Sequence, residues 1–215
     1  MENEINIVIA ENSFLFRQAL REFLERYSPF RILADVSNGR ELMSLLNSTK
    51  PDIILLDISM PVMTGMEALI QITHNHPSIK CVMLTIYDDY SIIEEALQNG
   101  AKGFLMKEKS IDDLVYTVQR VHETGFYLES TLVEKILINR PNKLGTTPKS
   151  RIALLSDREN EIFELICKGL NDKEIAMVLH ISPHTVHSHR SSIFAKTQTH
   201  STSQLLLYAF NNAPK

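Results

Sequence analysis

The chain has 215 residues, of which 44% are hydrophobic and 22% are charged, with a formal net charge of −4. These values are typical of globular proteins, so they exclude an intrinsically disordered chain, and the length is sufficient for two domains. No apolar run approaches the length needed to cross a membrane, and the start of the chain, residues 1–6, is acidic where a signal peptide would be basic. We therefore expect a cytoplasmic protein with no membrane partner.

The cysteine content and the charge distribution bear on two further questions: whether the chain has disulfide or metal sites, and whether it binds nucleic acid. Cys81 and Cys167 both lie in apolar segments, so buried thiols are expected and a disulfide framework or zinc site is not. Residues 1–150 carry 15 basic and 20 acidic side chains, a net charge of −5, whereas residues 151–215 carry 7 and 6, a net charge of +1. An acidic body followed by a weakly basic, histidine-rich segment is compatible with nucleic-acid binding.

Short apolar runs alternate with helical patterns over the first 125 residues. The runs are typical of buried parallel strands and comprise Ile5–Ile9, Ile32–Val36, Ile53–Leu56, Cys81–Leu84 and Gly103–Met106. Apolar residues three and four positions apart predict helices at residues 14–27, 40–47, 66–75 and 91–99, and a capping box from Ser110 to Asp113 begins a fifth helix that ends near Gly125. Five β-α repeats predict an α/β fold with a doubly wound five-stranded parallel sheet.

The remaining residues predict a linker and a second, all-α domain. Residues 126–153 are interpreted as the linker, in which Ser130–Asn139 could form a short helix. Residues 154–215 predict four helices, which are signalled by Ser156 with Glu159, by Asn171 with Glu174, by Ser182-Pro183, and by the apolar segment from about Ser201 to Asn211. The second and third of these helices, joined by a tight turn, predict a helix-turn-helix.

Polar residues stand at the ends of the predicted strands, where apolar residues would otherwise continue. They are Glu11 and Asn12 after the first strand, Asp57 after the third, Thr85 after the fourth and Lys107 after the fifth. A single acidic residue in such a position is usually a helix cap or a solvated loop residue. Because the carboxyl ends of parallel strands meet at one edge of the sheet, these five are expected to converge on one crevice.

This pattern resembles the receiver domain of two-component response regulators. The resemblance covers residues 5 to about 124 and is carried by Asp57-Ile58-Ser59-Met60-Pro61-Val62-Met63-Thr64-Gly65, by Leu84-Thr85 and by Gly103-Phe104-Leu105-Met106-Lys107. It implies that Asp57 accepts a phosphoryl group from the phosphohistidine of a partner sensor histidine kinase. It also implies that Mg²⁺ is held by Glu11, Asn12, Asp57 and the carbonyl of Ser59, that Thr85 and Lys107 bind phosphoryl oxygens, and that Thr85 and Phe104 act as the switch.

Two departures from the receiver pattern qualify these expectations. The family usually has two acidic residues at the end of the first strand, but here the pair is Glu11-Asn12. Asn12 can offer a neutral amide oxygen, so we expect a weaker Mg²⁺ site. Phe104 keeps the aromatic character of the usual switch residue without its hydroxyl. The leading alternative is therefore a degenerate receiver whose DNA binding is set by a ligand, a protein partner or expression level.

Residues 154–212 resemble the LuxR-type helix-turn-helix of the NarL/FixJ class of regulators. The matching residues run from Leu155-Ser156-Asp157-Arg158-Glu159 through Gly169–Ala176 to Thr185-Val186, His189-Arg190, Ile193 and Lys196. Helical spacing places Val186, His189 and Ile193 on the inner face of the third helix. The DNA-facing set is expected to be His184, Thr185, His187, Ser188 and Ser191, with Lys173, Arg190 and Lys196 as backbone contacts. Because operator sites for such regulators are usually paired, a homodimer is expected when the protein is active.

Departures and rival interpretations remain for this second domain. The family commonly has lysine at the positions of His184 and His187, and polar Thr197 lies in line with the buried face, where it could loosen the end of the helix. A protein-binding adaptor that has lost DNA affinity is favoured by the net charge of only +1. A metal site at His180, His184 and His187 is disfavoured because Ser182-Pro183 interrupts the helix between them. An enzyme is not expected, since an aspartate phosphatase would need a second acid where Ser59 stands.

Overall fold

The computed structural model describes residues 4–86, 90–129, 132, 155–167, 169–202, 204–205 and 208. The chain divides into two compact units, residues 1–127 and residues 128–215, and each is described by itself. None of the helices within the described ranges is both long enough and apolar enough to span a membrane.

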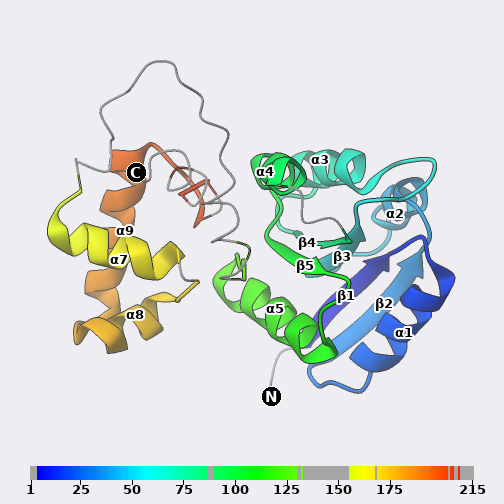
Figure 1. Ribbon diagram of the computed structural model, residues 1–215, viewed down its shortest axis with the longest axis horizontal. Coiled ribbons are helices and arrows are strands. Elements are labelled where there is room, and N and C mark those ends of the chain that lie inside the picture. Colours follow the sequence, from blue (N-terminus) through cyan, green and yellow to red (C-terminus); the bar gives the residue numbers. More distant parts are fainter. Residues whose placement is uncertain are drawn as a thin grey trace. The chain divides into compact units, whose positions relative to one another are not determined.

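The first unit is built on a sheet of five parallel strands (Figure 1). They are β1 (Ile5–Ala10), β2 (Phe30–Val36), β3 (Ile53–Asp57), β4 (Lys80–Thr85) and β5 (Gly103–Met106), arranged in the order β2-β1-β3-β4-β5. The chain first moves outward from β1 to β2 and then crosses back to β3. This reversal confirms the doubly wound sheet, and it opens a crevice at the carboxyl ends of β1 and β3.

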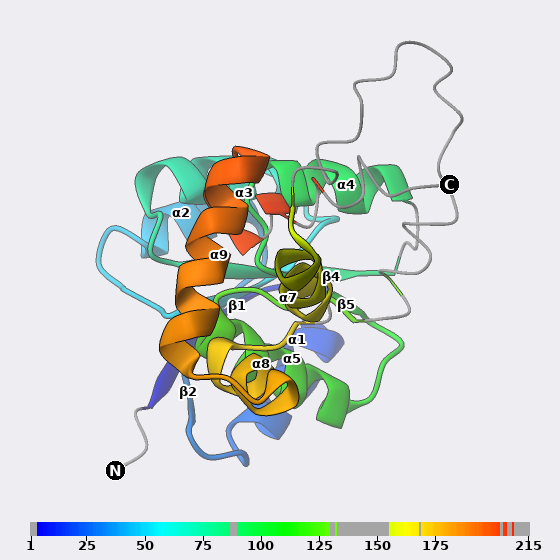
Figure 2. The ribbon, with the colours of Figure 1, turned by 90° about the vertical axis from the view of Figure 1, so that its left-hand side faces the viewer.

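Five helices cover the two faces of this sheet. Helices α1 (Phe14–Leu24) and α5 (Ile111–Thr124) lie on one face, and α2 (Gly39–Leu45), α3 (Gly65–Asn75) and α4 (Tyr90–Gln98) lie on the other (Figures 1 and 2). Side chains that alternate along the strands pack against α1 and α5, as expected for a pleated sheet. The buried side chains on this face include Ile7, Ile9 and Leu55 from the strands, Leu24 from α1 and Val118 from α5.

The first unit continues beyond the predicted boundary at residue 125. Tyr127 pairs with Gly103 of β5 in a parallel bridge, and Phe126 is buried. The first two residues of the predicted linker therefore belong to the edge of the sheet. Of the possible helix at Ser130–Asn139, only Leu132 lies within the described residues, and it is helical.

The second unit is helical, as the sequence predicts. It contains α7 (Asp157–Cys167), α8 (Asp172–Leu179) and α9 (Pro183–Thr197), which share a core of aliphatic side chains that includes Ile162, Ile175, Val186 and Ile193. Within the predicted fourth helix, residues 202, 204, 205 and 208 are helical, and the rest of Ser201–Asn211 lies outside the described residues apart from Ser201 itself.

The helix starts of this unit follow the capping signals in the sequence. Asn171 and Glu174 form a capping box at the start of α8. The Ser182 hydroxyl accepts from the Thr185 amide at 3.0 Å, and Pro183 occupies the first turn of α9. Each side chain satisfies backbone N–H groups that would otherwise lack partners, and this fixes where the helices begin.

Candidate functional site

The predicted acidic pocket is present at the carboxyl edge of the sheet. Glu11 follows β1, Asp57 ends β3, Thr85 ends β4 and Lys107 follows β5. Because β1 and β3 are neighbours, Glu11 and Asp57 reach the same crevice, and the side chains of both are almost wholly buried. The structure thus brings together both predicted carboxylates and the predicted lysine.

Lys107 connects the two carboxylates. Its Nζ lies 2.8 Å from Glu11 Oε2 and 2.9 Å from Asp57 Oδ1, and it also lies 5.4 Å from the centre of the Phe16 ring. Two buried carboxylates so close together repel each other unless a cation neutralises them. Lys107 supplies that neutralisation from one side, with the aromatic face of Phe16 as a third favourable contact.

Asp57 has one satisfied and one unsatisfied oxygen. Oδ1 accepts from Lys107 and from the Ser59 amide at 3.1 Å, whereas Oδ2 is buried and has no hydrogen-bond partner among the residues that the structure describes. A buried carboxylate oxygen without a partner is costly. It is therefore the natural position for a cation ligand or for a new covalent bond.

The residues fit a divalent cation, with one difference from the expected ligand arrangement. The pocket offers the two carboxylates of Glu11 and Asp57, and the second of these has an oxygen that is unpaired among the described residues. Carboxylate oxygens are the donors that Mg²⁺ prefers. Asn12 was expected to offer its amide oxygen to the metal. In the structure its Nδ2 donates to the Ser59 carbonyl at 2.7 Å, so the carbonyl that was assigned to the metal already accepts one hydrogen bond from a neutral amide.

Gly65 explains how α3 begins so close to the pocket. A Cβ atom at this position would lie 2.0 Å from the backbone oxygen of Asp57, which no side chain can tolerate. The Gly65 amide also donates to the Ile58 carbonyl at 3.0 Å. The glycine at the end of the Asp57 motif therefore allows the loop after β3 to fold back against its own strand.

The two predicted switch residues are both enclosed. Thr85 and Phe104 are each 1% exposed, and the Thr85 carbonyl accepts from the Lys107 amide at 2.8 Å. Ile86, the next residue after Thr85, is exposed. The transition from a buried to an exposed side chain thus occurs directly after the predicted switch threonine.

In the helical unit, α8 and α9 form a helix-turn-helix. The turn begins at His180, which adopts a left-handed conformation with φ 52° as the C-cap of α8, and ends at Ser182, the N-cap of α9. Val186 and Ile193 are buried as predicted, and His189 is half-buried. The side chains expected to face DNA are exposed: His184, Thr185, His187, Ser188 and Ser191 on α9, and Lys173 on α8.

Two cations predicted to contact the DNA backbone instead form ion pairs within this unit. Arg190 Nε lies 2.8 Å from Asp172 Oδ1 on α8, and Lys196 Nζ lies 2.6 Å from Glu159 Oε2 on α7. These pairs tie α9 to both of the other helices. Sequence spacing did not reveal them, because the partners are 18 and 37 residues apart.

Glu159 has three roles in this arrangement. It caps α7 by accepting from the Ser156 amide, and it also accepts from the Ser192 hydroxyl and from Lys196. Burial alone would raise its pKa, but hydrogen bonds from Lys196, Ser192 and Ser156 outweigh that effect, and the pKa falls to about 2. The carboxylate is therefore ionised in the folded unit except at strongly acidic pH.

Thr197, which could loosen the end of the helix as a polar residue on the buried face, has hydrogen-bond partners for its hydroxyl. Thr197 is buried, but its hydroxyl donates to the Ile193 carbonyl at 2.7 Å and lies 2.9 Å from the Thr199 hydroxyl. A buried hydroxyl with partners carries little penalty. The helix ends one residue later, where Gln198 adopts a left-handed conformation with φ 56°.

Comparisons with known proteins agree with both units. Residues 7–119 match the family described as response regulator receiver domain, and residues 153–209 match the bacterial regulatory proteins of the luxR family. The transcriptional regulatory protein LnrK of Bacillus subtilis is 34% identical, over 95% of this chain and 96% of its own. The transcriptional regulatory protein DegU of Brevibacillus brevis is 30% identical, over 98% of this chain and 95% of its own.

Solved structures give the same assignment. A LuxR-family DNA-binding response regulator from Staphylococcus aureus is 35% identical, with a TM-score of 0.54, over 55% of this chain and 99% of its own. The RcsB response regulator of Salmonella typhimurium, which is 21% identical, shares the fold over 95% of this chain and 98% of its own, with a TM-score of 0.60. The chain therefore belongs to the two-component response regulators of the LuxR family, in which a receiver domain precedes a helix-turn-helix DNA-binding domain.

Proposed function

We propose that phosphorylation of Asp57 by a partner sensor histidine kinase controls sequence-specific DNA binding by this protein, and thereby transcription. The observation that carries the proposal is the state of Asp57. One oxygen is bound by Lys107 and by the Ser59 amide, and the other is buried without a partner. Such a carboxylate has its first oxygen held in place and its second oxygen left for attack on phosphorus, which supports the proposal.

The transfer itself needs positioning and charge neutralisation. Asp57 Oδ2 forms a bond to phosphorus while the bond from phosphorus to the donor histidine nitrogen breaks, and the released imidazole takes up a proton. Mg²⁺, when bound at Glu11 and Asp57, supplies neutralisation of the phosphoryl oxygens. Lys107, already 2.9 Å from Asp57 Oδ1, neutralises a further oxygen, and the buried Thr85 hydroxyl is the group we assign to a third.

We assign the output to the exposed surface of α9. His184, Thr185, His187, Ser188 and Ser191 are available to a major groove, with Lys173 as a backbone contact. Arg190 and Lys196 are each held in an ion pair, so we assign them first to the orientation of α9 and only then to phosphate contacts. A homodimer acting in the cytoplasm is the form we propose for the active protein, because paired half-sites require two such helices.

Intact-mass measurement after incubation with Mg²⁺ and acetyl phosphate tests the input. Wild-type protein should gain one phosphoryl group, and the Asp57→Asn variant should gain none. A modification that persists in Asp57→Asn would place the acceptor elsewhere. Absence of any modification with the small donor and with kinases would support the degenerate receiver, which the Asn12–Ser59 hydrogen bond favours.

A gel-shift assay against promoter DNA tests the output. Binding that strengthens on phosphorylation is the expected result. Binding of equal strength in wild-type protein and Asp57→Asn, before and after treatment with the donor, would show phosphorylation-independent regulation. Absence of DNA binding in both states would favour a protein-binding adaptor, the alternative supported by the internal ion pairs of Arg190 and Lys196.

A further inference from the structure

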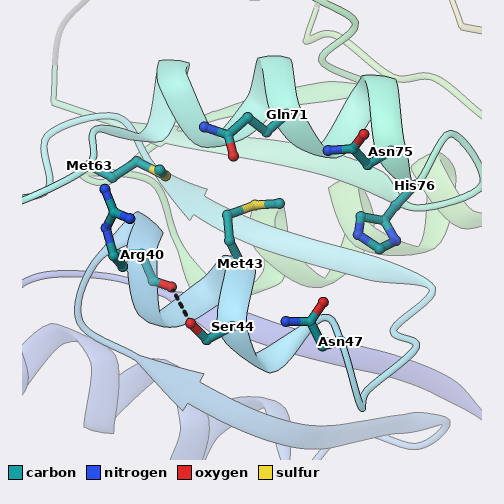
Figure 3. A pocket seen from close by; sticks show the side chains of 8 residues that line it. All are labelled: Arg40, Met43, Ser44, Asn47, Met63, Gln71, Asn75 and His76. Carbon is teal, nitrogen blue, oxygen red and sulfur yellow. Dashed lines mark hydrogen bonds between the residues drawn. The ribbon is translucent and has the colours of Figure 1, made fainter.

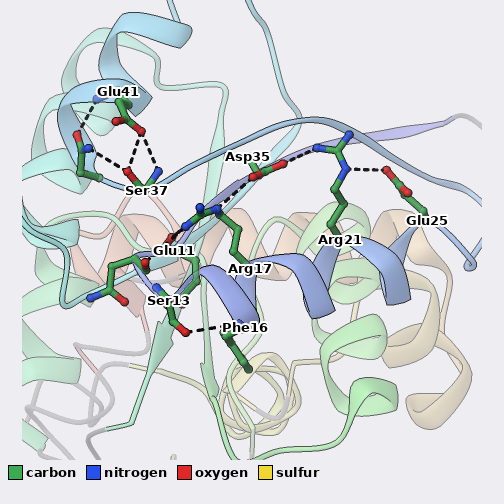
Figure 4. A network of polar contacts seen from close by, with 11 residues as sticks. Glu11, Ser13, Phe16, Arg17, Arg21, Glu25, Asp35, Ser37 and Glu41 are labelled. Carbon is green, nitrogen blue, oxygen red and sulfur yellow. Dashed lines mark hydrogen bonds and ion pairs between the residues drawn. The ribbon is translucent and has the colours of Figure 1, made fainter.

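A buried arginine on α1 connects the acidic pocket to the edge strand of the sheet. Arg17 is 12% exposed, and its Nη1 donates to the Glu11 carbonyl at 2.5 Å, while its Nε lies 3.1 Å from Asp35 Oδ1 on β2 (Figure 4). The same Nη1 lies 3.5 Å from the Asn12 carbonyl. Arg17 therefore spans the turn that carries both Glu11 and Asn12.

Glu11 is fixed at four points, and Arg17 provides one of them. The Glu11 amide donates to the Val36 carbonyl at 3.0 Å, and Oε1 accepts from the Ser13 amide at 2.9 Å. Oε2 pairs with Lys107. The carbonyl is held by Arg17 alone among the contacts of the described residues. This contact fixes the peptide plane between Glu11 and Asn12, and so the direction in which both side chains leave the chain.

Asp35 holds Arg17 in place and also accepts a hydrogen bond from a second arginine, Arg21. Its second oxygen accepts from Arg21 Nη1, and Arg21 also pairs with Glu25 at 3.0 Å. The hydrogen bond that Arg21 donates to Asp35 is the main reason that the pKa of Arg21 is raised, although partial burial opposes the effect. Arg21 thus engages the same carboxylate as Arg17, but none of its contacts reaches the turn at Glu11 and Asn12.

We propose that Arg17 is a positioning residue of the acidic pocket: held by Asp35, it sets the direction of the Glu11 carboxylate toward the metal and the phosphoryl group. The inference rests on the proposed phosphorylation of Asp57. Arg17 contacts neither Asp57 nor Lys107 in the structure, so it acts through the Glu11 carbonyl. Residues that orient metal ligands commonly change metal affinity when they are removed.

Calorimetric titration of the unphosphorylated protein with Mg²⁺ tests this role. In Arg17→Met, the Mg²⁺ dissociation constant should rise about tenfold, and the Mg²⁺ concentration for half-maximal phosphorylation by acetyl phosphate should rise in parallel. Arg17→Lys should recover part of the loss, because an ammonium can donate to the Glu11 carbonyl without forming the fork to Asp35. Urea unfolding of each variant measures how much stability is lost.

Arg21→Met is the matched control. It removes a guanidinium from the same carboxylate, together with the Glu25 pair, and should lower stability while leaving the Mg²⁺ dissociation constant unchanged. Equal Mg²⁺ affinity in wild type and Arg17→Met, or equal losses in Arg17→Met and Arg21→Met, would overturn the inference. If wild-type protein neither binds Mg²⁺ nor becomes phosphorylated, the proposed function fails first, and the inference fails with it.

Discussion

Asn12 Nδ2 donates a hydrogen bond of 2.7 Å to the backbone carbonyl oxygen of Ser59. This contact joins the turn after β1 to the loop after β3, directly beside the two buried carboxylates. It also means that a neutral amide takes a position where a charged ligand would strengthen cation binding.

Replacing Asn12 with aspartate should therefore tighten Mg²⁺ binding on the order of tenfold. Phosphorylation by acetyl phosphate should also become faster at limiting Mg²⁺. Calorimetric titration measures the first effect and the Mg²⁺ dependence of the rate measures the second. Asn12→Ala is the control, because it removes the hydrogen bond to Ser59 without adding charge. If the alanine variant gains as much affinity as the aspartate variant, competition for the Ser59 carbonyl, not charge, limits the wild-type site.

Lys107 should stabilise the pocket most when no divalent cation is bound. Lys107→Met leaves the buried Glu11 and Asp57 without their cation, so the free energy of unfolding should fall on the order of 3–5 kcal/mol. Adding Mg²⁺ should restore more stability to this variant than to wild type, because the metal then supplies all of the neutralisation. Thermal unfolding with and without Mg²⁺ measures both effects. The exposed Lys50, replaced in the same way, should show neither. An identical Mg²⁺ effect in wild type and Lys107→Met would argue against a shared electrostatic role.

The depressed pKa of Glu159 predicts an acid-sensitive contact between α7 and α9. Its pKa of about 2 lies below the ordinary value of 4.5. The ionised carboxylate therefore contributes stability that is fully present above about pH 4.5 and is lost as the pH falls toward 2. Hydrogen–deuterium exchange of α7 and α9 in the full chain, measured across this range, should show protection decreasing with acidification. In Glu159→Gln the same segments should be less protected at neutral pH and should respond less to acid. A pH response equal to that of wild type would assign the effect to other groups.

The histidines on the exposed face of α9 predict a pH-dependent affinity for DNA. Histidine gains positive charge as the pH falls from about 8 to 6, and phosphates favour the charged form, so binding should strengthen over that interval. His184→Lys combined with His187→Lys should give stronger binding that no longer depends on pH. Its salt dependence should also be steeper, by about 0.9 in log–log slope for each added phosphate contact.

Fluorescence anisotropy with labelled operator DNA, at constant ionic strength, measures this affinity. The double variant His184→Gln with His187→Gln serves as the uncharged control and should flatten the pH profile. Asp172 lies 3.5 Å from His187 Nδ1 and also binds Arg190, so it competes with phosphate for the charged histidine. A flat wild-type profile would show that these histidines act as neutral groups.

Local patterns in the sequence were sufficient for most of the fold. Short, mostly apolar runs located all five strands, because a strand covered on both faces has few polar side chains. The polar exceptions within these runs are Asn6 in β1 and Asp35 in β2. The strand β2 begins at Phe30, two residues earlier than predicted, because exposed Arg31 breaks the apolar run. Capping residues located the starts of α5, α7, α8 and α9, because each cap depends on residues at most three positions away.

The candidate site could be predicted only as a set of converging residues. That Glu11, Asp57 and Lys107 meet follows from parallel strands, whatever their detailed packing. The direction of the Asn12 amide does not follow from the strand arrangement, since it depends on the position of the Ser59 carbonyl across the pocket. The same is true of Arg17 with Asp35 and of Lys196 with Glu159. Each is an ion pair between distant segments, and no local periodicity marks it.

A second concave site, a groove between α2 and α3, differs from the acidic pocket in the state of its polar side chains. It encloses about 380 Å³ and is lined mostly by polar side chains, among them Arg40, Ser44, Gln71 and His76 (Figure 3). Ser44 donates to the Arg40 carbonyl at 3.0 Å, within its own helix. Among the described residues, no side chain that lines the groove has a buried oxygen without a partner, whereas Asp57 does.

Helix α9 keeps its anchors and its exposed side chains at different positions. Val186, Ile193, Arg190 and Lys196 hold the helix in its bundle, whereas His184, His187, Ser188 and Ser191 are exposed. The hydroxyls of Ser188 and Ser191 donate to carbonyls of α9 itself, and His187 lies beside Asp172 of α8. If the proposed DNA-binding role of α9 holds, exchanging the four exposed side chains should change the operator preference and leave the free energy of unfolding nearly unchanged.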